Sequence, residues 1–135
     1  MNESVYKQLL SVVLPKEISE FFELVKVDVE PGIEGTLHMY LDEKALTPDD
    51  RSDLQPNGFY SESLITHFPI ADHKTVLHVR RRRWKDAAGK SFGKDWDLVA
   101  QGTRFSKEFA AFLKDAYGYG ADNGSIAGSP VPFGI

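Results

Sequence analysis

The apolar residues at the start of the chain recur at a spacing that predicts two amphipathic helices. Ser4 is a suitable N-cap for the first helix. Pro15 interrupts the first pattern and can occupy the first turn of a second helix, which is predicted over residues 16–25. The apolar faces consist of Val5, Leu9, Val12 and Val13 in the first helix and Ile18, Phe21, Phe22 and Val25 in the second.

The pattern then changes to the period of two that is typical of strands. Apolar and polar residues alternate over 25–29 and again over 37–41, and a Pro-Gly pair between them starts a turn. These segments predict a β-hairpin with one apolar face. The polar segment 44–58 contains two prolines and is predicted to be a loop, and a further strand is expected within 59–70.

A second strand pair and a final helix are predicted in the C-terminal half. Residues 75–85 are expected to form a strand that includes four consecutive arginines, and residues 92–99 its partner after a turn at 87–90. Ser106 is the expected N-cap of a helix that ends at Tyr117. The apolar face of this helix consists of Phe109, Phe112, Leu113 and Ala116.

The order of these elements predicts an α+β fold. We expect the N-terminal helices and the C-terminal helix to pack on an antiparallel β-sheet that carries the Arg-rich strand or hairpin. Residues 1–117 are expected to form a single domain. Segment 118–135 is rich in Gly, Ser and Pro, has no apolar period, and is predicted to be a flexible tail.

The distribution of charge along the chain is far from even. The formal net charge is −4, yet residues 74–114 contain 11 Lys and Arg against 4 Asp and Glu, whereas residues 1–73 contain 5 against 14. The basic residues are concentrated at Arg80–Arg83. Four adjacent guanidinium groups repel one another, and nucleic-acid phosphate is the commonest polyanion that can supply the counter-charge.

Strand alternation divides the basic segment into two faces, with Arg80 and Arg82 on one and Arg81 and Arg83 on the other. A two-stranded ribbon fits the DNA major groove, and arginine binds phosphate and guanine bidentately. A charged sheet edge that prevents aggregation, or a different acidic partner, would also account for the run. The residues expected to contact nucleic acid are Arg80, Arg81, Arg82, Arg83, Trp84, Lys85, Lys90, Lys94, Arg104 and Lys107.

No residue pattern indicates catalysis, and we expect neither enzymatic activity nor a cofactor. The chain has no cysteine, which excludes disulfides, thiol nucleophiles and Cys-based zinc sites. Asp95 and Asp97 are expected to pair with arginines across the hairpin. The histidines at 38, 67, 73 and 78 lack metal-binding spacing, so a metal site would require the fold to bring them together.

Several segments resemble the N-terminal region of bacterial insertion-sequence transposases of the ISAon type. The segments are 1–18, YLDEK at 40–44, FPI at 68–70 and, above all, 77–115. The resemblance implies a non-catalytic module that binds double-stranded DNA at the ends of the element, with the acidic-triad catalytic domain elsewhere. ISL-three-type transposases are more remotely similar. Their cysteine zinc ribbon has no counterpart here, so a metal-free hairpin must replace it.

Two other functions remain open. The acidic residues 1–73 are suited to dock a separate catalytic transposase subunit, which would make the chain a protein-interaction module. A small nuclease or RNA-processing enzyme would need His and Asp residues gathered by the fold. Because no long apolar run or signal peptide is present, we expect no membrane association and a cytoplasmic, nucleoid-associated location.

Overall fold

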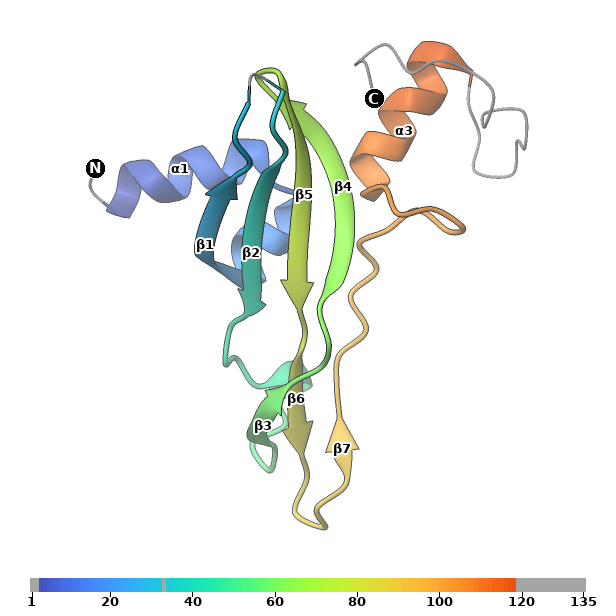
Figure 1. Ribbon diagram of the computed structural model, residues 1–135. Coiled ribbons are helices and arrows are strands. Elements are labelled where there is room, and N and C mark those ends of the chain that lie inside the picture. Colours follow the sequence, from blue (N-terminus) through green and yellow to red (C-terminus); the bar gives the residue numbers. More distant parts are fainter. Residues whose placement is uncertain (1–2, 33, 119–135) are drawn as a thin grey trace.

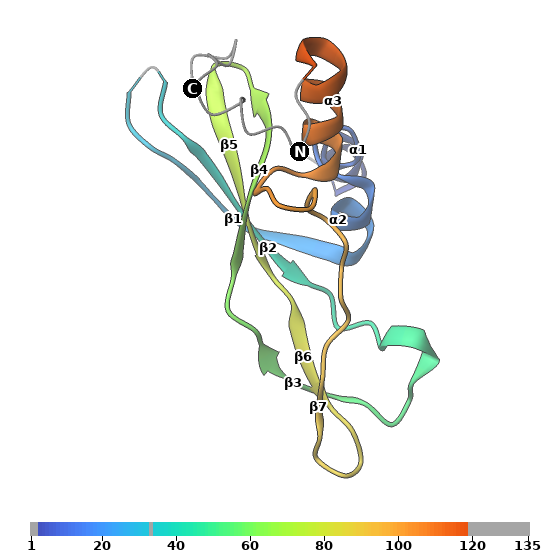
Figure 2. The same cartoon turned by 90° about the vertical axis from the view of Figure 1, so that its right-hand side faces the viewer.

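Three α-helices lie on the same side of a sheet in the computed structural model, which describes residues 3–32 and 34–118 (Figures 1 and 2). Helix α1 covers Glu3–Val13, α2 covers Lys16–Phe21 and α3 covers Lys107–Tyr117. The α+β class expected from the sequence is therefore confirmed. The predicted tail lies outside the described residues, apart from Gly118.

The larger sheet has four strands in the order β1-β2-β5-β4. Neighbouring strands β1 and β2 are antiparallel, as are β4 and β5, but the central pair β2 and β5 is parallel. The sheet is thus mixed, whereas the sequence predicted antiparallel pairing throughout. The strands are β1 Phe22–Val29, β2 Leu37–Glu43, β4 Ser63–Ile70 and β5 His73–Arg80.

The smaller sheet projects from the lower end of the larger one, as a narrow extension (Figure 1). Its three strands have the order β3-β6-β7 and are all antiparallel. They are β3 Gln55–Phe59, β6 Arg82–Lys85 and β7 Ser91–Phe92, and a 3-10 helix, η1, at Pro48–Asp50 precedes them. We call residues 55–59 and 82–92 the stalk.

The core lies between the larger sheet and the helices. Alternate residues of β2 and β5 point into it, because side chains on a strand alternate between the two faces. Each fully buried aliphatic or aromatic side chain contributes about 1.5–3 kcal/mol to folding. The buried cluster consists of Leu14, Ile18, Phe22, Met39, Leu41, Ile65, Leu77, Val79 and Leu98.

The two edges of the larger sheet differ. At the β4 edge, the chain before α3 covers Thr66: the Thr66 amide donates to the Arg104 carbonyl at 2.7 Å, and the Ser106 amide donates to the Thr66 carbonyl at 2.9 Å. At the β1 edge, no strand of the described residues pairs with the outer side of β1. One edge of the sheet is therefore closed and the other is open.

The N-terminal boundaries differ from those predicted. Helix α1 begins at Glu3, so Ser4 is inside it and is not the N-cap. Helix α2 ends at Phe21, and Phe22 takes an extended conformation opposite Glu43 of β2. The helical period of 22–25 was misleading because the same apolar residues also fit a strand, and pairing with β2 decides the outcome.

The predicted face of α1 is also largely exposed. Leu9 and Val12 are 49% and 78% exposed, whereas Leu10 and Val13 pack against the core. The first helix is therefore confirmed as a helix, but most of its predicted apolar face is exposed.

The C-terminal half follows the prediction more closely. Ser106 is confirmed as the N-cap of α3, since its hydroxyl accepts a hydrogen bond from the Phe109 amide at 3.2 Å. The predicted strand 75–85 is divided into β5 and β6 at Arg81. Its partner is shorter than predicted: β7 contains two residues, and 93–98 is irregular.

Candidate nucleic-acid interface

The arginine run lies where the larger sheet continues into the stalk. Arg80, the last residue of β5, donates two hydrogen bonds to the Asp42 carboxylate at 2.7 and 2.6 Å. These bonds raise the pKa of Arg80 above its ordinary value. The guanidinium also lies over the Phe59 ring, 4.3 Å from its centre. A bidentate ion pair on an aromatic ring fixes the orientation of this side chain.

Arg82 contacts the other residues of this junction. Its guanidinium lies 4.6 Å from the centre of the Phe59 ring and its Nε donates to the Glu43 carbonyl at 3.2 Å. Arg80 and Arg82 therefore share Phe59, as expected for alternate residues on one face. The two cations are held near one ring because guanidinium groups stack well on aromatic faces.

The remaining two arginines bind backbone carbonyls on the stalk and beside it. Arg81 lies 4.6 Å from the centre of the Tyr60 ring and donates to the Lys94 carbonyl at 3.1 Å. Arg83 donates from Nε to the Asn57 carbonyl at 3.0 Å. Arg81, Arg82 and Arg83 are all half-buried. The run therefore joins β3, β5, β6 and the segment after β7, in addition to carrying charge.

Trp84 does not lie on the surface. Its side chain is 1% exposed, and its Nε1 has no hydrogen-bond partner within the described structure. Stacking on a nucleotide base would require the ring to leave the core of the stalk. The prediction that Trp84 contacts nucleic acid is therefore wrong, because the ring is buried.

The expected pairing of Asp95 and Asp97 with the arginines is also wrong. Asp97 accepts a hydrogen bond from Lys107 at the start of α3, with 2.8 Å between the carboxylate and the ammonium, and this bond raises the pKa of Lys107. The carboxylate bound by the run is Asp42 of β2. Asp42 lies 38 residues before Arg80 in the sequence, so no local pattern indicated this pair.

The exposed cations of the stalk are at its tip. Lys85 and Lys90 flank the turn that joins β6 to β7, and both are exposed. Asp86 shapes this turn by accepting hydrogen bonds from the amides of Ala88 and Lys90, at 3.0 and 2.8 Å. Gly89 has a φ of +82°, a conformation that favours glycine. The turn therefore uses the single acidic residue of the stalk for its own structure.

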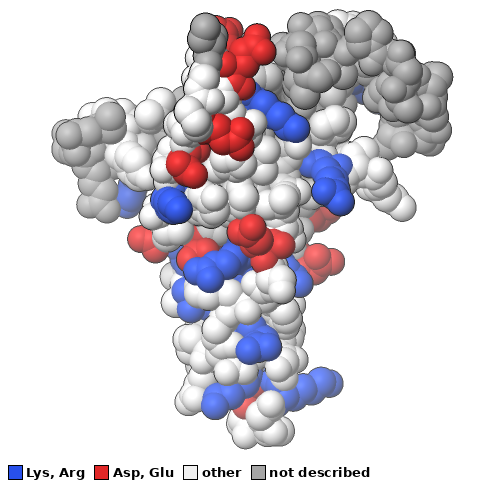
Figure 3. Space-filling view, in the orientation of Figure 1, with Lys and Arg blue, Asp and Glu red and all other residues white. Residues whose placement is uncertain are grey.

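The predicted contact residues do not form one surface. Figure 3 shows blue side chains spread over the lower part of the molecule with little red among them, whereas the upper part carries both colours. Arg104 and Lys107 lie beside β4 and at the start of α3, away from the stalk. Residues 80–94 contain seven Lys and Arg against one Asp and are brought together by the fold.

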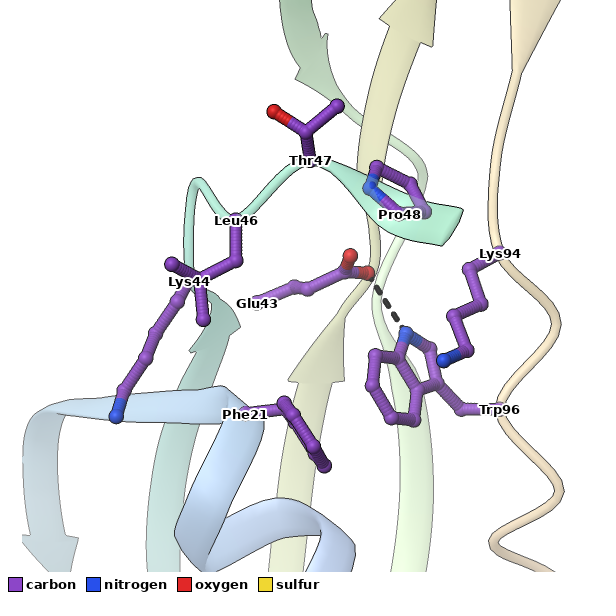
Figure 4. A pocket seen from close by; sticks show the side chains of 8 residues that line it. All are labelled: Phe21, Glu43, Lys44, Leu46, Thr47, Pro48, Lys94 and Trp96. Carbon is purple, nitrogen blue, oxygen red and sulfur yellow. Dashed lines mark hydrogen bonds between the residues drawn. The ribbon is translucent and has the colours of Figure 1, made fainter. Parts of the chain in front are cut away.

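A small pocket lies where the stalk joins the body (Figure 4). Glu43 is 3% exposed, and its Oε1 accepts hydrogen bonds from Trp96 Nε1 at 2.9 Å and from the Arg82 amide at 3.1 Å. The Lys94 ammonium lies 4.3 Å from the centre of the Trp96 ring. The pocket, of about 160 Å³, is lined by Phe21, Glu43, Lys44, Leu46, Thr47, Pro48, Lys94 and Trp96.

The pocket is better suited to a structural role than to catalysis. Its volume is below the range of about 300–1,000 Å³ that is typical of small-molecule sites. Glu43 connects the end of β2 to β6 and to the irregular segment 93–98 through two hydrogen bonds. No sequence pattern indicated the roles of Glu43, Phe59 and Tyr60, because their partners lie more than 20 residues away along the chain.

The four histidines do not converge. His38 and His78 contact each other on the outer face of the sheet, with 2.8 Å between Nδ1 and Nε2. His67 is buried against Ser106 and His73 contacts the Gly35 carbonyl. Burial lowers the pKa of His67 below its ordinary value. No group of His, Asp and Glu in the described part of the chain is arranged to hold a metal ion.

Comparisons with protein-family models, with curated proteins and with solved structures found no match to this chain. Among the described helices, none combines the length and the apolar composition that crossing a membrane requires.

Proposed function

We propose that the chain binds nucleic acid through the stalk, as the DNA-binding N-terminal region of an insertion-sequence transposase. The observation that carries this proposal is the concentration of seven cationic residues against one acidic residue in segment 80–94, which contributes to the stalk and to its junction with the body in an otherwise acidic chain. A positively charged projection attracts phosphate over long range, and a β-ribbon of this kind fits a DNA groove.

The proposed contact residues fall into two groups. Lys85 and Lys90 at the tip are exposed and bind phosphate as flexible point charges. Arg82 and Arg83 are half-buried and fixed by bonds from Nε, so the free edges of their guanidinium groups present oriented donors. Fixed donors lose little conformational entropy on binding, which favours a defined position of the stalk on the duplex.

The assignment to transposition, and to DNA at element ends, rests on the resemblance of segment 77–115 described above. Phosphate contacts position a protein without reading sequence. We therefore propose that the isolated chain binds duplex DNA with modest sequence preference, and that selection of element ends involves the catalytic subunit or domain.

A salt titration with a fluorescent DNA duplex tests this function. If four to six phosphates are neutralised, the logarithm of the binding constant will fall against the logarithm of the salt concentration with a slope of about −4 to −5. Absence of binding at about 50 mM salt would refute DNA binding by the isolated chain.

A further inference from the structure

The open edge of the larger sheet carries an unusual set of side chains. Val25, Val27 and Val29 of β1 are each about half exposed. Lys26 and Asp28 alternate with them and are exposed on the opposite face. An edge strand presents unpaired N–H and C=O groups, and soluble proteins normally protect such an edge by a cover or by inward charges. The β4 edge has a cover, whereas β1 has a bulge between Leu24 and Lys26, and its regular segment 26–29 has no strand partner on the outer side among the described residues.

Helix α1 extends this apolar surface beyond the sheet. It lies on the helix-covered side and projects past β1 (Figures 1 and 2). Leu9 is 49% exposed. Val12 does not belong to this surface, because it lines a pocket with Phe68 and Ile70 of β4, at the opposite edge of the sheet. A strand added to the β1 edge would lie next to the projecting part of this helix (Figure 1).

We infer that the β1 edge is the interface for a second copy of this chain, paired antiparallel to its own β1 about a two-fold axis at Val27. This inference is independent of nucleic-acid binding. A two-fold interface must be self-complementary, because each residue meets its counterpart in the other copy. With Val27 opposite Val27, the apolar residue at the axis meets its own counterpart within the regular segment 26–29, and Val25 lies at the bulge that β1 makes between Leu24 and Lys26.

The charges select the same register. With Val27 at the axis, Lys26 of each copy lies opposite Asp28 of the other, so two opposite-charge pairs form across the interface. A shift of the axis to Lys26 or to Asp28 places like charges opposite each other. A shift by a single residue would exchange the two faces of the added strand. Among the registers with the two-fold axis at residue 26, 27 or 28, only the one at Val27 places valine opposite valine on one face and opposite charges across from each other on the other face.

The pairing would join two four-stranded sheets into one continuous sheet. Because the two β1 strands run in opposite directions, the stalks of the two copies would point in opposite directions. The interface would leave both stalks accessible, since β1 and the stalk lie at different places on the molecule (Figure 1).

Charge reversal tests this register directly by sedimentation velocity of the full chain over a concentration series. The wild-type chain is expected to form dimers. Lys26→Asp places carboxylates opposite each other, and Asp28→Lys places ammonium groups opposite each other. Each single variant should weaken dimerisation by about 10- to 100-fold. Both residues are exposed, so circular dichroism should show an unchanged fold.

Recombining the charges gives the decisive result. An equimolar mixture of Lys26→Asp and Asp28→Lys should form 1:1 heterodimers, because every cross-strand pair is then attractive. The double variant, which carries both substitutions in one chain, should again form homodimers. Lys74→Asp and Asp72→Lys are matched controls, since both residues are exposed and lie outside β1. These control variants should dimerise as the wild type does.

Three results would overturn the inference. They are a wild-type chain that remains monomeric at all concentrations, single variants that dimerise as well as the wild type, and a mixture that stays monomeric although both single variants are folded. If the β1 variants dimerise as strongly as the wild type, the dimer forms through a different surface.

Discussion

The role of an individual side chain in this protein depends on its contacts as well as on its residue type. The four arginines illustrate this: Arg80 binds Asp42, and Arg81 and Arg83 donate to backbone carbonyls. The sequence indicated a cluster of charge, and the structure adds that each guanidinium also holds a neighbouring segment in place. Charge and stability are therefore coupled at the same residues.

This coupling predicts that Arg81→Lys and Arg83→Lys destabilise the fold although they keep the charge. Lysine lacks the planar fork that stacks on Tyr60 and reaches the carbonyl. Each variant should lower the free energy of unfolding by about 1 kcal/mol, measured in urea. Lys85→Ala is the control and should change it by less than about 0.5 kcal/mol. Equal effects of all three substitutions would contradict this role.

His67 predicts a dependence of stability on pH. Its folded-state pKa is lowered by burial below the ordinary value of 6.5, so the unfolded chain binds the proton more readily. The stability that the buried neutral His67 contributes is therefore fully present above about pH 6.5, and it is lost as the pH falls below that value. The difference in unfolding free energy between wild type and His67→Asn should shrink on acidification, by at most about 1.4 kcal/mol per pH unit. A pH-independent difference would show that His67 does not titrate in this way.

At the scale of elements, the joint between the two sheets depends on one buried carboxylate. Glu43 ends β2 and accepts hydrogen bonds from Trp96 Nε1 and from the Arg82 amide that begins β6. An acceptor at this position satisfies donors on two segments that no strand pairing connects to β2. Loss of the acceptor would leave both donors unpaired at a buried site.

We therefore expect Glu43→Leu to cost about 2–4 kcal/mol in unfolding free energy, because two donors lose their acceptor. Glu43→Gln keeps a carbonyl oxygen in the same place and should cost less than half as much. Trp96 fluorescence and urea denaturation together measure the local and the global effect. Similar costs for Leu and Gln would mean that the charge, and not the acceptor, matters here.

An element could be predicted from the sequence where the residues that determine it are adjacent along the chain. The cap of α3 at Ser106 was correctly predicted, because the capping residue and the apolar period are adjacent in the sequence. The end of α2 was not, since Phe22 fits both a helical and a strand period until β2 pairs with it. No sequence pattern indicated that Phe59 and Tyr60 contact the arginines, because β3 lies beside β6 only in the folded chain.

At the scale of the whole molecule, acidic and basic regions are separated in space. The residues outside the stalk carry both signs with an excess of Asp and Glu, 19 against 12 Lys and Arg, and the stalk carries four Lys and Arg against one Asp (Figure 3). A projecting basic stalk on an acidic body is expected to approach a polyanion with the stalk first, since the body repels phosphate. The orientation of binding would then be set before any specific contact forms.

The most direct test of nucleic-acid binding by the stalk compares the salt dependence of duplex binding for two double variants. Lys85→Ala with Lys90→Ala removes the two exposed charges at the tip, and Lys74→Ala with Lys114→Ala removes the same charge elsewhere. We predict that the stalk variant reduces the magnitude of the salt slope by about 2, one unit per phosphate contact, and weakens binding. The control should keep the wild-type slope. Equal slopes for the two variants would contradict binding through the stalk.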